Sequence, residues 1–151
     1  MWQWRRQRPR WERDGAMLTI VTTASILLLL AWFTVFITGL SVGGIIFAEK
    51  GFDLLTFVWW VMFAGCVILF LVNPAIGQYV CVVFMLMWIA MQSLNFFARS
   101  PQRISGYNKL FERTHHIIPP SEKVVIPDTA HLILFSLLLI AFVLMSIKIF
   151  M

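Results

Sequence analysis

Four long apolar runs without a charged side chain in their middle dominate this chain. A helix needs roughly 20 apolar residues to cross the hydrocarbon core of a bilayer, which is about 30 Å thick. Only 13% of the residues are charged, whereas soluble domains have about a quarter. The sequence therefore predicts an all-α integral membrane protein with four transmembrane helices, at about residues 16–40, 54–72, 74–97 and 129–148.

Hydrogen-bonding side chains stand just before each apolar run. A helix leaves its first N–H groups without partners, and an Asp or Asn at the N-cap accepts hydrogen bonds from them. The residues in this position are Asp14, Asp53, Asn73 and Asp128. Pro74 follows Asn73 at the first helical position, where a missing N–H costs nothing. We therefore expect a tight hairpin between the second and third helices, rather than one long crossing in a three-span chain.

A basic segment rich in arginine and tryptophan precedes the first run. Indole rings favour the headgroup level of a membrane, and guanidinium groups favour anionic phosphates. We therefore predict a membrane-interface arm at 1–15 and a single four-helix membrane domain at 16–151, with an extramembrane loop at 98–128. A docking arm for a neighbouring subunit is the alternative, and nucleic acid is not an expected partner. The arm residues are Trp2, Trp4, Arg5, Arg6 and Trp11.

Positive charge does not decide the orientation of the four spans. Lys148 and the five N-terminal arginines give six positive charges on one side, and Lys50 with the loop at 98–128 gives six on the other. The first helix usually dominates topology. We therefore expect both termini on the cytoplasmic or matrix side of a bacterial inner membrane or an organellar membrane.

Polar uncharged side chains form a seam along one face of the first and third helices. Hydroxylated residues in lipid usually mark close helix packing, and amides hydrogen-bond across helices. The lining of a permeation path is the alternative. Gly39 and Gly43, with three residues between them, add a signal for close approach of another helix. The seam residues are Thr19, Thr23, Thr34, Thr38, Gln78 and Gln92.

The three histidines of the chain lie near the start of the fourth span, together with carboxylates. Imidazole and carboxylate groups together can hold a borderline metal, although the spacing matches no specific metal template. The competing interpretation needs no metal, because Asp128 caps the fourth helix and pairs with a histidine one turn later. The candidate metal ligands are His115, His116, Asp128 and His131.

Upstream of these histidines, Ile104, Tyr107 and Phe111 have the spacing of a short amphipathic helix. Such a helix places its apolar face in the headgroup layer. We expect this one to lie on the membrane surface, or to offer the same face to a partner protein.

No motif in the sequence names a reaction, so an enzyme is not expected. Our first hypothesis is a non-catalytic accessory or assembly subunit of a larger integral membrane complex, which acts by helix packing and loop contacts. The alternatives are a homo-oligomeric channel or small transporter, and a metal- or haem-binding membrane protein that uses the histidine loop. Ion-coupled transport is disfavoured because no span has a charged group at its centre. The expected partners are the bilayer and other membrane subunits, with bound lipid rather than a cofactor.

Overall fold

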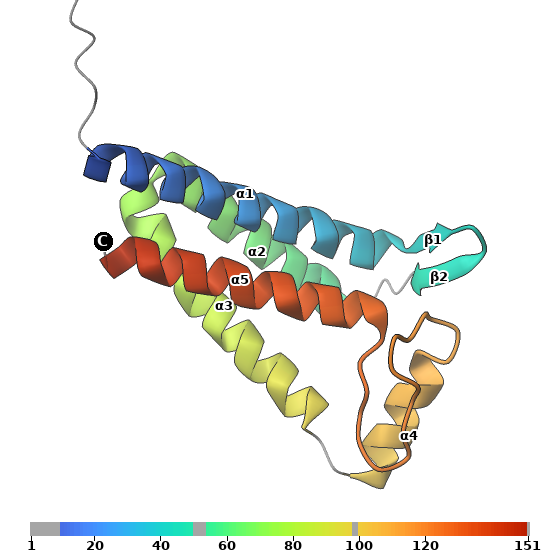
Figure 1. Cartoon of the computed structure of the whole chain (residues 1–151). Coiled ribbons are helices and arrows are strands. Elements are labelled where there is room, and N and C mark those ends of the chain that lie inside the picture. The colour runs from blue at the N-terminus through green and yellow to red at the C-terminus, as the bar shows by residue number, and fades with distance from the viewer. Residues whose placement is uncertain (1–9, 50–53, 98–99, 151) are drawn as a thin grey trace, which may run out of the picture.

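The computed structural model describes residues 10–49, 54–97 and 100–150, with side chains from residue 14 onward. Four long helices and one short helix form most of this part of the chain (Figure 1). Two short antiparallel strands join the first helix to the second. In chain order the elements are α1 (Arg10–Thr38), β1 (Leu40–Val42), β2 (Ile45–Ala48), α2 (Leu54–Val72), α3 (Pro74–Phe96), α4 (Pro101–Leu110) and α5 (Thr129–Phe150).

Four of these helices, α1, α2, α3 and α5, are long and apolar enough to cross a membrane. The shortest of them, α2, has 19 residues, and a rise of 1.5 Å per residue makes it about 28 Å long. This length is close to the thickness of the hydrocarbon core. The predicted helical class and the four apolar helices are confirmed, and they indicate a multi-pass membrane protein.

The first helix begins earlier than the sequence predicted. Because α1 starts at Arg10, Asp14 lies inside the helix and does not cap it, which corrects that prediction. Trp11 belongs to the first turn of α1, so the predicted arm at 1–15 ends within the helix. Three other predicted features lie outside the described residues, namely the Asp53 cap, the tryptophans Trp2 and Trp4, and the arginines Arg5 and Arg6.

The hairpin between α2 and α3 follows the prediction. Asn73 is the only residue between the two helices, and its side-chain oxygen accepts a hydrogen bond from the Ile76 N–H at 3.3 Å. Its own N–H donates to the carbonyl of Leu69, and its carbonyl accepts from the N–H of Gly77. With Pro74 in the first helical position, one of the N–H groups that would need a partner at the start of α3 is missing, and Asn73 accepts from two of the others.

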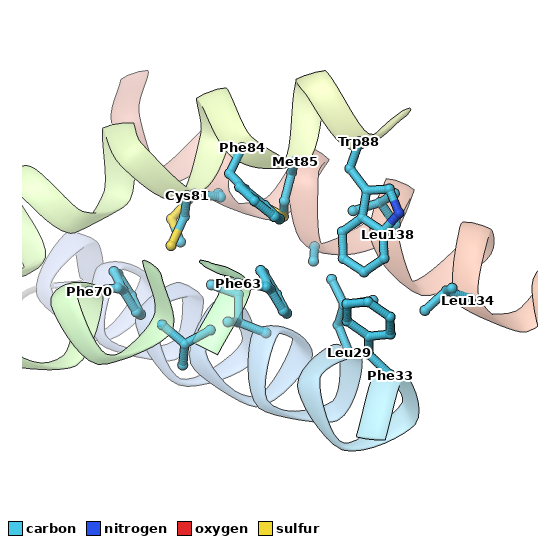
Figure 2. Close-up of a cluster of buried hydrophobic side chains, with 14 residues drawn as sticks. Leu29, Phe33, Phe63, Phe70, Cys81, Phe84, Met85, Trp88, Leu134 and Leu138 are labelled. Carbon is cyan, nitrogen blue, oxygen red and sulfur yellow. The ribbon is translucent and has the colours of Figure 1, made fainter. Parts of the chain in front are cut away.

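Aromatic rings fill the centre of the bundle (Figure 2). Trp88 of α3 contacts Phe33 of α1, with ring centroids 4.6 Å apart, and Phe63 of α2, at 5.6 Å. Phe63 also stacks on Phe84 at 5.7 Å. Lipid tails are as apolar as these side chains, so burial from water does not drive the helices together within a bilayer. Close packing and ring contacts therefore carry the stability of the core.

Two indole N–H groups add hydrogen bonds between helices. Trp32 of α1 donates to the carbonyl of Ala130 in α5 at 3.2 Å. Trp60 of α2 donates to the hydroxyl of Thr34 in α1 at 3.0 Å. These bonds fix α1 against both of its neighbours near the end where α5 begins.

Glycines turn the chain between α1 and β2. Gly39 has a φ of 84° just after the end of α1, and Gly43 and Gly44 have φ of 61° and 83° in the two-residue loop between the strands. Two consecutive positive φ values are typical of a type I′ hairpin turn, which strongly favours glycine. Gly39 and Gly43 therefore lie in turns, and the predicted close helix contact at these two glycines is wrong.

The strands, α4 and the segment 111–128 lie at one end of the bundle, and we refer to them as the cap (Figure 1). The start of α1 and the end of α5 lie at the opposite end. His115 connects the parts of the cap with the bundle. Within the cap, its N–H donates to the carbonyl of Ile46 in β2 at 2.7 Å. The carbonyl of His115 accepts from the N–H of Thr129, the first residue of α5, at 2.9 Å.

Candidate functional site

A buried carboxylate and a histidine meet where the cap joins α5. Asp128 precedes the helix, and its Oδ1 atom accepts a hydrogen bond from the His131 N–H at 3.0 Å. This is the N-cap geometry that the sequence predicted. The same oxygen bonds Nδ1 of the His131 ring. Asp128 is 1% exposed and His131 is 9% exposed, so the pair lies inside the protein.

The surroundings of Asp128 stabilise its ionised form. Burial by itself would raise the pKa of this carboxyl, but its hydrogen bonds with the side chain and backbone N–H of His131 outweigh burial and lower its pKa below the ordinary value. The N-terminus of α5 adds a favourable partial positive charge. The second oxygen, Oδ2, is buried and has no hydrogen-bond partner among the described residues. Asp128 is therefore an ionised carboxylate that accepts from His131.

Aromatic rings from three parts of the chain surround the His131 ring. Phe36 of α1 lies edge-on at 4.6 Å and Phe111 of the cap at 4.7 Å, measured between ring centroids. Tyr107 of α4 lies at 5.9 Å. Burial, and then the negative charge of Asp128, raise the pKa of Tyr107, so its hydroxyl keeps its proton.

The apolar face of α4 packs against the protein itself. Ile104 is buried, and Tyr107 and Phe111 turn toward His131. The sequence predicted the α4 helix and this face correctly, but it placed the face on the membrane surface or on a partner. The face packs inward because its aromatic side chains cover the polar pair of Asp128 and His131.

Two cavities share His131 in their lining. The inner cavity, about 220 Å³, lies between α1, α2, α3 and α5 and opens to the surface beside the exposed Leu55 and Asn95. Its lining includes the aromatic side chains Phe33, Phe36, Trp59 and Trp88. The outer cavity, about 450 Å³, lies between the end of α3, α4 and the start of α5. Three polar side chains line both cavities, and these are Gln92, Asn95 and His131.

Hydrogen-bonding atoms at this boundary are unused within the described part of the chain. Nδ1 of His131 bonds Asp128, whereas Nε2 forms no hydrogen bond with another described residue. The side-chain amides of Gln92 and Asn95 likewise form no hydrogen bond with another described residue. The arrangement can therefore bind a polar group that enters either cavity.

The other two histidines form hydrogen bonds that stabilise the cap and its junction with α5. His115 bonds the Thr129 hydroxyl through Nδ1 at 2.8 Å, and its ring lies 5.4 Å from that of Phe47. His116 bonds the carbonyl of Phe111 through Nε2 at 3.0 Å. Of the four proposed metal ligands, Asp128 and His131 form a bonded pair. Over residues 10–49, 54–97 and 100–150, no three His, Cys, Asp or Glu side chains are grouped to hold a metal ion.

The residues of the predicted seam do not share one surface in the structure. Thr19, Thr23, Thr34 and Thr38 donate their hydroxyls to carbonyls four residues earlier in α1. Thr19, Thr34 and Thr38 are exposed on the outside of the bundle. Gln78 lies near the opposite end of α3 from Gln92, 14 residues or about 21 Å along the helix. Thr34 contacts α2 through the Trp60 indole N–H. Whether the other seam residues contact another helix or a permeant stays a prediction.

Sequence reasoning found Gln92, Asp128 and His131, but it missed Asn95 and assigned Tyr107 to the membrane surface. The spacing of Gln92 and Asn95, three residues apart near the end of an apolar run, places both amides on one helix face. That spacing was the available signal. Nothing in the sequence connected this face with His131, because their contact depends on how α3 and α5 meet.

No protein-family model, curated protein or solved structure matches this chain significantly. Its class therefore rests on the fold, which is a bundle of four apolar helices with a small cap.

Proposed function

We propose that this protein is a non-catalytic accessory or assembly subunit of a larger integral membrane complex, and that the outer surface of the cap contacts another subunit. The proposal takes the four apolar helices as the part that lies in lipid. In this arrangement both termini lie on one side of the membrane and the cap on the other. We assign the termini to the cytoplasmic or matrix side on the dominance of the first helix.

Exposed apolar side chains on the cap carry the proposal. Apolar side chains on the four long helices face lipid, so their exposure needs no partner. On the cap, however, Leu110 is 67% exposed, Ile117 is 64% exposed and Ile118 is 53% exposed. Val42 and Ile45 of the strand hairpin are also exposed at this end of the bundle. Exposed apolar side chains outside the membrane core, where they form a continuous surface, are typical of a contact with another protein.

The threonines of α1 support contact over a permeation path through a single bundle. Their hydroxyls are already bonded to carbonyls of their own helix, and three of the four lie on the outer surface of the bundle. A small hydroxylated surface of this kind allows close approach of a neighbouring helix. A path through a single chain would instead need these side chains in its interior.

The test is to extract the protein from native membranes in a mild detergent and to size whatever migrates with it. We expect a stoichiometric assembly that mass spectrometry resolves into this chain and other membrane proteins. Ile117→Asp places a charge on the exposed apolar surface, and we expect it to release the chain from that assembly. Ser105→Asp adds the same charge at an exposed polar position of α4 and should leave the assembly intact.

Migration of the wild-type chain alone, or only with copies of itself, would contradict the accessory role. Flux of ions through vesicles that contain the pure protein would then favour the channel hypothesis. Equal behaviour of Ile117→Asp and Ser105→Asp within an intact assembly would remove the cap surface from the contact.

A further inference from the structure

The boundary between the two cavities has the properties of a ligand site. We propose that the cavities bind a lipid-soluble molecule with a hydroxylated aromatic ring, a phenol or a quinol, whose hydroxyl donates a hydrogen bond to Nε2 of His131. The inference concerns the cavities at His131, whereas the proposed subunit contact is tested at Ile117, which lines neither cavity. The two proposals can therefore fail separately.

The Asp128 and His131 pair selects a hydrogen-bond donor. An ionised carboxylate only accepts hydrogen bonds, so Nδ1 of His131 must carry the proton that it shares with Asp128. In the neutral imidazole, Nε2 then has a free lone pair and acts as an acceptor. A ligand at Nε2 must present a donor, and a hydroxyl group does so without a net charge. Gln92 and Asn95 offer both donors and acceptors to a second oxygen on the same ring.

The lining and size of the inner cavity favour an aromatic ring. Phe33, Phe36, Trp59 and Trp88 surround the space, and aromatic rings pair with one another by offset or edge contacts. Its volume of about 220 Å³ is below the range of roughly 300–1,000 Å³ that encloses a drug-sized ligand. The inner cavity therefore suits a single ring, and an apolar tail would extend into the outer cavity or into lipid.

Other ligand classes match the site less well. A phosphate headgroup requires Lys, Arg or several N–H donors, but no Lys or Arg lines the inner cavity, and Arg103 borders only the outer one. The negative charge of Asp128 would also oppose a phosphate beside His131. A metal ion would need more His, Cys, Asp or Glu ligands than the described residues place together.

The experiment uses the full chain in phosphatidylcholine nanodiscs and two probes that differ in one property. In 4-octylphenol the hydroxyl can donate, whereas in 4-octylanisole a methyl group replaces its proton. Trp59 and Trp88 line the inner cavity, so tryptophan fluorescence reports occupancy. We expect saturable binding of 4-octylphenol, about tenfold tighter than that of 4-octylanisole, which is the scale of one neutral hydrogen bond.

Two variants test whether the preference for 4-octylphenol depends on His131. His131→Phe keeps a ring among Phe36 and Phe111 but removes Nε2, and we expect it to bind both probes equally. His116→Gln is the matched control, because His116 borders neither cavity, and it should keep the tenfold preference. Thermal unfolding checks that both variants fold.

The wild-type comparison needs no variant and is decisive by itself. Equal affinity for the two probes, or fluorescence changes that do not saturate, would overturn the proposal. A phenol preference that persists in a folded His131→Phe variant would overturn the assignment to Nε2. Displacement of 4-octylphenol by added anionic phospholipid, but not by a quinol, would assign the cavities to a lipid headgroup and likewise overturn it.

Discussion

Gly77 of α3 lies against the backbone of Phe70 in α2, so closely that a Cβ atom on Gly77 would be 2.3 Å from the Phe70 Cα and 2.4 Å from its N. Real Cβ atoms do not approach backbone atoms to this distance. The hairpin that begins at Asn73 therefore closes only because residue 77 has no side chain. This contact sets how tightly α2 and α3 pack.

We predict that Gly77→Ala destabilises the bundle by about 1–3 kcal/mol, the usual cost of forcing an extra methyl group into a packed interior. Gly65→Ala is the matched control in the same hairpin, because no atom lies within 4 Å of its added Cβ. Alanine favours a helix over glycine, so the control should be neutral or slightly stabilised. Thermal unfolding in one detergent compares the two variants. Equal unfolding temperatures for both would show that α3 can shift at no cost.

The hydrogen bond from Trp60 to Thr34 predicts an energetic coupling between α2 and α1. We expect Trp60→Phe and Thr34→Val to be non-additive, with a coupling of about 0.6 kcal/mol, the mean found for such bonds in membrane proteins. A double-mutant cycle of unfolding free energies measures this coupling. Additive single effects would mean that the two side chains do not stabilise the folded state through this bond.

The type I′ turn between β1 and β2 predicts opposite outcomes for two substitutions at Gly43. Valine is strained at a φ of 61°, so Gly43→Val should destabilise the hairpin by roughly 1–2 kcal/mol. Asparagine tolerates this backbone conformation, and Gly43→Asn should be nearly neutral. Amide hydrogen exchange of Val42 and Ile45, the pair that closes the two-residue loop, reports the stability of the hairpin. Equal exchange in both variants would contradict the turn geometry.

The Asp128 carboxylate predicts a dependence of stability on pH. Its pKa in the folded protein lies below the unfolded value, which is about 3.9. The stabilisation is therefore fully present above the unfolded pKa and is lost as the pH falls through the lower, folded pKa. We expect the unfolding temperature of the wild type to fall more steeply below pH 4 than that of Asp128→Asn.

Asp128→Asn is informative because asparagine is also a good N-cap. The variant keeps an acceptor for the His131 N–H but loses the charge. Asp128→Ala removes both and should cost at least the 0.5–2 kcal/mol of a lost cap, so roughly 1 kcal/mol or more. Parallel pH profiles for the wild type and Asp128→Asn would show that the charge contributes nothing.

Much of the fold follows from local sequence. The apolar runs define four helices because lipid requires every backbone N–H and C=O to be bonded within its own segment. Asn73 and Pro74 define the hairpin, and Asp128 defines the start of α5, because each satisfies orphan N–H groups by itself. These features depend on residues a few positions apart, so they can be predicted from the sequence.

Tertiary structure alone decided the candidate site. Asn95, Tyr107 and His131 are far apart in the chain, and their meeting depends on the relative placement of α3, α4 and α5. The threonines of α1 could face inward or outward by their spacing, and only the packing of α1 against α2 and α5 put three of them outside. The amphipathic face of α4 could contact lipid or protein. In the structure its aromatic side chains contact His131 and shield the buried pair of Asp128 and His131 from solvent. Spacing fixes which side chains share a face, whereas the contacts between helices fix what that face meets.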